Sequence, residues 1–160
     1  HDLHVLHHRR ERLKGTLAMA LASLALRTSN TTISNSSWEL RTTSGAKCRI
    51  LEMALIQVTG TASSYGIGRP AAQGVTPATT STFQRDISTD PACVTTASLT
   101  WGTSPTAPAN YIRRWNSAAT VGVGVIFTFP RGLEVPISSS FVVFNITATV
   151  ALDVNCAIDE

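Results

Sequence analysis

Hydrophobic and polar residues alternate in short runs along most of the chain, a pattern typical of half-buried β-strands. Between Ser37 and Thr43, for example, Trp38 and Leu40 alternate with Glu39 and Arg41. The pattern and the turn residues between runs predict eight strands: Ser37–Thr43, Ala46–Val58, Cys93–Trp101, Tyr111–Trp115, Gly122–Phe129, Leu133–Ile137, Ser140–Thr147 and Ala151–Ile158. Such a series predicts an all-β fold, a two-sheet antiparallel sandwich of jelly-roll type.

The run Ala46–Val58 is apolar on both faces from Leu51 to Leu55, which indicates a central strand covered on both sides. A helix over the same residues from Lys47 is the competing interpretation. The flanking Gly45 and Gly60 and the β-branched ends favour the strand.

The first 27 residues differ from the rest, and three interpretations stand for them. They hold all four histidines and a charged stretch, followed by the short apolar run TLAMALASLAL. The native start could be Met19, the segment could be an arm or short helix reaching a neighbour, or it could be a secretory signal. We therefore predict an arm, leader or non-native extension over residues 1–27 and a sandwich domain over residues 28–160.

Residues 60–92 show no clear strand pattern and are rich in Gly, Pro, Ser and Thr. A loop of this length in a compact domain usually carries function or assembly contacts. Tyr65, Phe83 and Ile87 are expected to anchor it to the sheet. A turn is predicted at Pro130-Arg131-Gly132, between the predicted strands Gly122–Phe129 and Leu133–Ile137.

The net charge of +3 comes entirely from the N-terminal segment. Residues 1–27 hold five cations and two carboxylates, whereas residues 28–160 hold eight of each. A nucleic-acid surface requires uncompensated cations, so we predict no nucleic-acid partner. No apolar run reaches the ~20 residues of a membrane-spanning helix, so we predict no membrane partner. Only 14% of residues are charged, which suits a protein held in a permanent assembly.

Candidate catalytic chemistry is sparse. No histidine follows His8, so Ser-His or Cys-His machinery is absent unless the N-terminal segment folds back. The carboxylates that could pair for acid–base chemistry are Glu39, Glu52 and Glu134. The sequence gives no means of pairing them, so we predict that the protein is not an enzyme.

The sequence evidence for metal and cofactor sites is equally weak, and we predict no such site. Cys48, Cys93 and Cys156 lie far apart and are interpreted as buried free thiols, with one bridge and one free thiol as the alternative. Asp153, Asp159 and Glu160 fit no known calcium loop. The glycines of YGIGRP are interpreted as a tight turn, because neither a following helix nor a third glycine completes a phosphate loop.

Tryptophan and arginine near strand ends are the best candidates for a protein interface, because both are enriched at binding hot spots. The candidate residues are Trp101, Arg113, Arg114, Trp115, Phe129 and Arg131. The alternative is that the two Trp rings fill the sandwich core.

The runs WELRTT, GIGRP, GVTP, TWGTSPTAP, FPRGLEVP and VALDVNCAIDE extend from Trp38 to Glu160. Together they resemble small β-rich virion proteins of tailed bacteriophages, of the head decoration or cement type. The resemblance implies a structural protein in the virion, assembled in the host cytoplasm. It also implies a homo-oligomer that contacts the major capsid protein or a tail protein. The alternative is a carbohydrate- or receptor-binding sandwich, such as a tail-fibre accessory domain. It needs exposed aromatic rings in a concave face or a metal site, and exposure of Trp101 and Trp115 in a groove would favour it.

Overall fold

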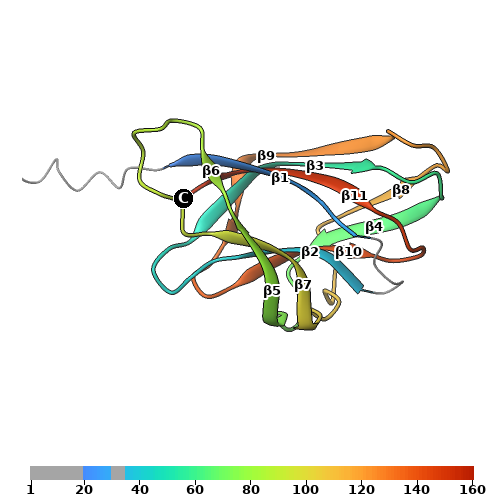
Figure 1. Cartoon of the computed structure of the whole chain (residues 1–160), viewed down its shortest axis with the longest axis horizontal. Coiled ribbons are helices and arrows are strands. Elements are labelled where there is room, and N and C mark those ends of the chain that lie inside the picture. Colours follow the sequence, from blue (N-terminus) through green and yellow to red (C-terminus); the bar gives the residue numbers. More distant parts are fainter. Residues whose placement is uncertain (1–19, 30–34) are drawn as a thin grey trace, which may run out of the picture.

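A computed structural model describes residues 20–29 and 35–160, which form two antiparallel sheets packed face to face (Figure 1). The eleven strands in this part of the chain are β1 (Leu21–Arg27), β2 (Asn35–Arg41), β3 (Cys48–Gln57), β4 (Ser63–Gly68), β5 (Val75–Thr82), β6 (Gln84–Arg85), β7 (Thr96–Thr103), β8 (Arg113–Ser117), β9 (Gly124–Val135), β10 (Ser140–Asn145) and β11 (Leu152–Asp159). The five-stranded sheet has the order β6-β1-β11-β3-β9, and the six-stranded sheet has the order β5-β7-β2-β10-β4-β8. The predicted all-β antiparallel sandwich is confirmed.

The strands pair in a nested way that defines a jelly roll. β1 pairs with β11, β2 with β10, β3 with β9 and β4 with β8, and successive pairs alternate between the two sheets. These eight strands form the two four-stranded halves of the fold. The three further strands, β5 to β7, lie between β4 and β8 in the chain and extend the two sheets at their other edges.

The sandwich begins earlier in the chain than predicted. β1 pairs with β11 from Leu21↔Asp159 to Arg27↔Asp153, so it is an integral strand and the domain does not begin at residue 28. The small side chain of Ala22 and the partly buried Leu24 and Leu26 face the core. The apolar run that suggested a signal or an arm is, from Leu21 onward, the alternating pattern of this strand. Residues 1–19, which hold all four histidines, lie outside the described residues.

The predicted loop over residues 60–92 contains β4, β5 and β6. β4 lies between β10 and β8, and two of its residues are glycines. A Cβ on Gly66 would lie 2.3 Å from the Tyr111 ring, and one on Gly68 would lie 3.1 Å from Pro108. The glycines of YGIGRP therefore make room for the segment before β8, and they do not form the predicted tight turn. Tyr65 and Phe83 are buried, whereas Ile87 is exposed.

The predicted turn at Pro130-Arg131-Gly132 lies inside one strand, β9. Opposite Ile50 the partner is Leu133, and opposite Glu52 it is Thr128, so four residues of β9 face one residue of β3. This large bulge keeps the two predicted strands in one ladder with β3. Pro130, without an N–H, and Gly132, with a φ of +68°, are the residues that permit it.

The inner faces of both sheets fill one core with large apolar side chains such as Trp38, Leu40, Phe141 and Met53. Cys48–Gln57 is a strand, as predicted, and not a helix. None of the described residues forms a helix with the length and apolarity that crossing a bilayer requires.

Candidate functional site

Three of the predicted interface residues line one depression at the β8–β9 edge of the sandwich. The depression has a volume of about 340 Å³ and is lined by Arg113, Thr128, Phe129, Pro130, Arg131, Gly132 and Leu133. The Arg113 guanidinium carbon lies 5.9 Å from the centroid of the Phe129 ring. Both arginines are exposed. The β9 bulge positions Phe129 and Arg131, so this depression depends on the strand irregularity described above.

Arg114 and Trp115 lie on β8 beside this depression, and each contacts a tyrosine. The Arg114 guanidinium lies 5.6 Å from the Tyr111 ring centroid. Trp115 stacks on the buried Tyr65 at 5.4 Å, with an interplanar angle of 20°. Trp115 is half-buried and packs against the core, so it contributes to both the core and the surface.

Trp101 lies away from the other five candidates. It belongs to β7, and β2, β10 and β4 separate β7 from β8 in the six-stranded sheet. Its Nε1 donates a hydrogen bond of 2.7 Å to the carboxylate of Glu39. The ring therefore holds the segment around Gly74 over the sheet, and it does not share a groove with Trp115.

Glu39 is fully buried on the outer face of the six-stranded sheet, where three groups satisfy it. Its carboxylate accepts hydrogen bonds from the Trp101 ring and from the Gly74 N–H at 3.1 Å. The third group is Arg41, whose Nε lies 3.2 Å from Oε2. Segments around Gly74 and Tyr111 cover this face, which explains why β2, β4 and β10 are buried on both sides.

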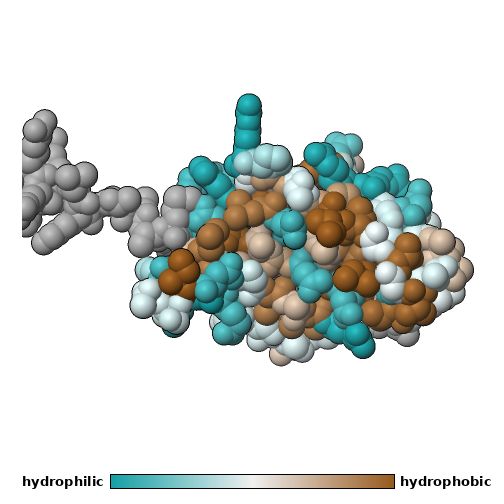
Figure 2. All heavy atoms as spheres, turned by 90° about the horizontal axis from the view of Figure 1, so that it is seen from above, coloured by the Kyte–Doolittle hydropathy of each residue, from teal (hydrophilic) through white to brown (hydrophobic). Residues whose placement is uncertain are grey.

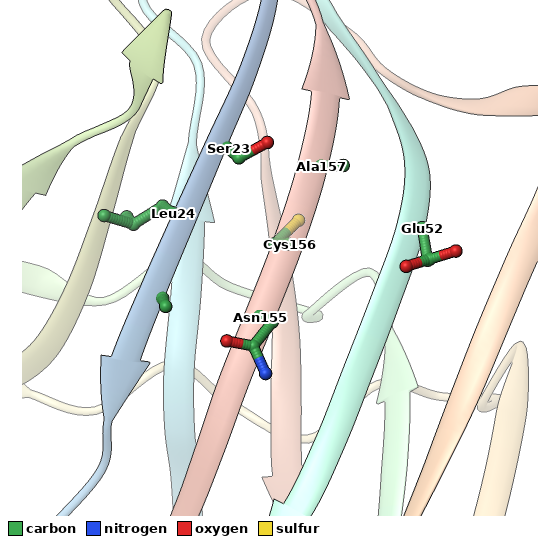
Figure 3. A pocket seen from close by; sticks show the side chains of 7 residues that line it. Ser23, Leu24, Glu52, Asn155, Cys156 and Ala157 are labelled. Atoms are coloured by element: carbon green, nitrogen blue, oxygen red, sulfur yellow. The ribbon is translucent and has the colours of Figure 1, made fainter. Parts of the chain in front are cut away.

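The outer face of the five-stranded sheet differs, because the side chains over the middle of β1 and β11 are small and uncharged. Figure 2 looks onto this face and shows brown apolar atoms between scattered teal ones. The uncharged outward-facing residues on β1, β11, β3 and β9 include Ser23, Ala25, Asn155, Ala157, Ala54, Ile56 and Ile126. The charged ones are Arg27, Asp153, Glu52, Arg49 and Asp159, most of which lie toward the strand ends. A shallow depression of about 270 Å³ lies over β1, β11 and β3, with Glu52 at its margin (Figure 3). Alternation along β1 is the sequence signal for part of this surface, but the interpretation of residues 1–27 as an arm, leader or extension places them outside the domain.

A third depression, of about 550 Å³, lies beside two of the cysteines. Cys48, Arg49 and Glu160 are among its lining residues. Glu160 accepts hydrogen bonds from the Cys93 thiol at 3.0 Å and from the N–H groups of Val94 and Thr95, both at 2.8 Å. These hydrogen bonds outweigh desolvation and lower the pKa of the Glu160 carboxyl.

All three cysteines are buried free thiols, as predicted. Burial raises the pKa of Cys48 and of Cys93 to about 12, and it raises the pKa of Cys156 well above its ordinary value. A thiol with such a pKa is protonated near neutral pH and is a poor nucleophile.

The carboxylates considered for acid–base chemistry do not gather. Glu39 lies in the six-stranded sheet, whereas Glu52 and Glu134 lie in the other sheet opposite different residues of their partner strands. Lys47 pairs with Glu134 at 3.2 Å, and Arg27 pairs with Asp153 at 2.7 Å. Within residues 20–29 and 35–160, no three His, Cys, Asp or Glu side chains are grouped as metal ligands would be.

No protein-family model, curated protein or solved structure matches this chain. The function is therefore inferred from the residues and their geometry. Two surfaces stand out: the depression at the β8–β9 edge and the outer face of the five-stranded sheet.

Proposed function

We propose that this chain is a structural protein of a virus particle that binds other protein subunits through the outer face of its five-stranded sheet. More specifically, we propose that it is a decoration protein on the head of a tailed bacteriophage. It would be assembled in the host cytoplasm and retained in the virion, with the shell protein as its partner.

The jelly-roll architecture is compatible with this role, and it supports the proposal by analogy alone. Viral capsid proteins use the fold, and so do lectins and cupins. Because one fold hosts many functions, the residues on the surface are a better guide to function than the fold.

The observation that carries the proposal is the difference between the two outer faces. The chain's own segments cover the six-stranded sheet, whereas the outer face of the five-stranded sheet is left open and carries Ala25, Ala54 and Ala157 near its centre. Interface cores are depleted of charged residues, because burying an unpaired charge is costly. A neighbouring subunit that covers the centre of this face would desolvate chiefly the charge of Glu52, because the other charged side chains lie toward the two ends of the strands.

The carbohydrate- or receptor-binding alternative has weaker support. It needs exposed aromatic rings in a concave face or a metal site. Three strands separate Trp101 from Trp115, and no three His, Cys, Asp or Glu side chains of residues 20–29 and 35–160 are grouped as metal ligands. Trp115 also has one ring face against Tyr65.

The test measures the chain in particles purified by density gradient from a culture that produces it. Quantitative mass spectrometry should find the chain in the particle fraction at many copies per particle. An Ala157→Arg variant, which places a charge on the open face, should lose at least about tenfold in incorporation. Thr79→Arg, on the exposed strand β5, is the matched control and should incorporate normally. A chain absent from particles, or equal incorporation of both folded variants, would overturn the proposal.

A further inference from the structure

Charge is segregated within the described part of the chain, although its total is close to zero. Six cations gather around β8, β9 and the adjoining ends of β3 and β4: Lys47, Arg49, Arg69, Arg113, Arg114 and Arg131. Glu134 lies among them, and Asp159 and Glu160 line one depression with Lys47 and Arg49, so the six cations and these three carboxylates have a net charge of +3. The other described residues hold three cations and five carboxylates, a net charge of −2. We call the group of six cations the basic edge.

Direct contacts bring most members of the basic edge together. Arg69 donates to the Glu134 carbonyl oxygen at 2.8 Å, and Lys47 pairs with the Glu134 side chain. Arg49 lies against Gly132 in the β9 bulge, and Arg113 and Arg131 line the depression around Phe129. Among the described residues, no carboxylate lies within ion-pair distance of Arg113, Arg114 or Arg131. The depression therefore combines an apolar floor with unpaired positive charge.

The opposite edge of the same five-stranded sheet presents an acidic, apolar projection. Ile87 is 53% exposed, and Leu21 beside it is 42% exposed. Asp86 donates its N–H to the Leu21 carbonyl, and its carboxylate accepts a hydrogen bond of 2.9 Å from Ser23. We call Leu21, Asp86, Ile87 and Asp90 the acidic knob. Arg85, the cation beside it, donates to the Asp90 carbonyl oxygen and not to a carboxylate.

We propose that copies of this chain associate side by side, with the acidic knob of one copy in the depression of the basic edge of the next. Ile87 would contact the apolar floor formed by Phe129, Pro130 and Leu133. The carboxylates of Asp86 and Asp90 would lie near Arg113 and Arg131 of the neighbouring copy. Arginine suits this role because its planar guanidinium binds carboxylates with two parallel hydrogen bonds.

A second copy fits the depression because one chain carries both complementary surfaces. β6 and β9 are the two edges of the five-stranded sheet, separated by about 19 Å at ~4.8 Å per strand. A contact between two different surfaces is heterologous, so it closes into a ring or continues as an array. The inference rests on the proposed assembly role, because binding to a shell would hold many copies side by side.

Sedimentation velocity of the full chain, over a range of protein concentrations, tests this association. Species larger than a monomer should form at low salt, and the apparent dissociation constant should rise at least about tenfold at high salt. Ile87→Ser should weaken association by about tenfold, because it removes the apolar part of the contact. The matched control is Val75→Ser, because Val75 on β5 is about as exposed as Ile87. This variant should leave association unchanged. A monomer under all conditions would overturn the inference.

Charge reversal gives a second test that a folding defect cannot imitate. Arg113→Glu with Arg131→Glu should abolish self-association, and so should Asp86→Arg with Asp90→Arg. An equimolar mixture of the two variants should associate again, because each contact then joins opposite charges. A mixture that stays monomeric, while circular dichroism shows both variants folded, would contradict the contact.

The two proposals can fail separately. Chains that incorporate into particles but remain monomeric in both experiments would refute the side-by-side contact and leave the virion role standing. Chains that associate through the knob but never enter particles would refute the virion role and leave the contact standing.

Discussion

At the scale of single residues, Glu39 shows how a buried charge holds a covering segment in place. It has no exposed side-chain surface, and it accepts hydrogen bonds from Trp101 and Gly74 beside the half-buried Arg41. Glu39→Gln should lower the free energy of unfolding by about 3 kcal/mol, because it leaves the Arg41 charge without its counter-ion. Urea denaturation measures the change. Glu52→Gln, at an exposed position, should change it by less than about 0.5 kcal/mol. Equal effects would contradict this role.

Glu160 should make stability depend on pH in the acid range. Its hydrogen bonds from Cys93, Val94 and Thr95 outweigh desolvation and lower its pKa in the folded state below the ordinary 4.5. The resulting stabilisation is present above pH 4.5 and is lost as the pH falls through the lowered pKa. Glu160→Gln should cost about 1 kcal/mol at pH 7 and should flatten the fall in unfolding free energy below pH 4.5. Denaturation between pH 7 and pH 3 checks both effects, with Glu52→Gln as the control for one lost charge. A variant with the acid profile of the parent would refute the assignment.

At the scale of elements, the bulge in β9 should depend on Gly132 more than the preceding turn depends on Gly122. Both glycines have positive φ, +68° and +83°. A Cβ on Gly132 would lie 2.9 Å from the Arg49 Cβ, whereas one on Gly122 would have no atom within 4 Å. Gly122→Ala should therefore cost about 1 kcal/mol from backbone strain alone, and Gly132→Ala about 2 kcal/mol. Equal costs in urea denaturation would show that the bulge has space to relax.

The strand β1 gives the second prediction at this scale. Ala22 faces the core without exposed surface, whereas Ala25 faces outward. Ala22→Asp should destabilise the fold by about 3 kcal/mol or more, because it buries a carboxyl group without a partner. Ala25→Asp should stay within about 0.5 kcal/mol of the parent chain in the same assay. Similar stabilities for the two variants would mean that β1 does not belong to the folded domain.

Strands with large apolar residues could be predicted from the sequence, and strands rich in small residues could not. The prediction Ala151–Ile158 rests on alternation and matches β11, whereas the prediction Ala46–Val58 rests on an apolar run between two glycines and matches β3. Ser63–Gly68 was missed because its glycines fit under Tyr111, a contact that depends on residues far away in the chain. Most of the predicted interface residues lie at one edge of the sandwich. Lys47, Arg49 and Arg69 lie beside them because β3 pairs with β9 and β4 pairs with β8. Sequence spacing carries no signal of that pairing.

At the scale of the whole molecule, the three thiols should report global unfolding. Cys48, Cys93 and Cys156 come from separate parts of the chain, and all are buried with raised pKa values. At pH 8, labelling by a disulfide reagent should be at least about a thousandfold slower in the folded chain than in urea-unfolded chain. Cys93, at 9% exposure, should react first. Immediate labelling of all three thiols in native buffer would contradict the packing.

The nested pairing also bears on how the protein is made. β11 follows the other ten described strands in sequence, yet it lies between β1 and β3 near the middle of its sheet. While the ribosome is still translating, the facing edges of β1 and β3 have no hydrogen-bonding partner, and such open edges invite aggregation. The sheet closes only after residues 152–159 emerge from the ribosome, so the facing edges of β1 and β3 stay unpaired while about a hundred residues between β3 and β11 are made. Because the final closure joins segments more than a hundred residues apart, we expect it to be slow, on the timescale of high-contact-order β-proteins.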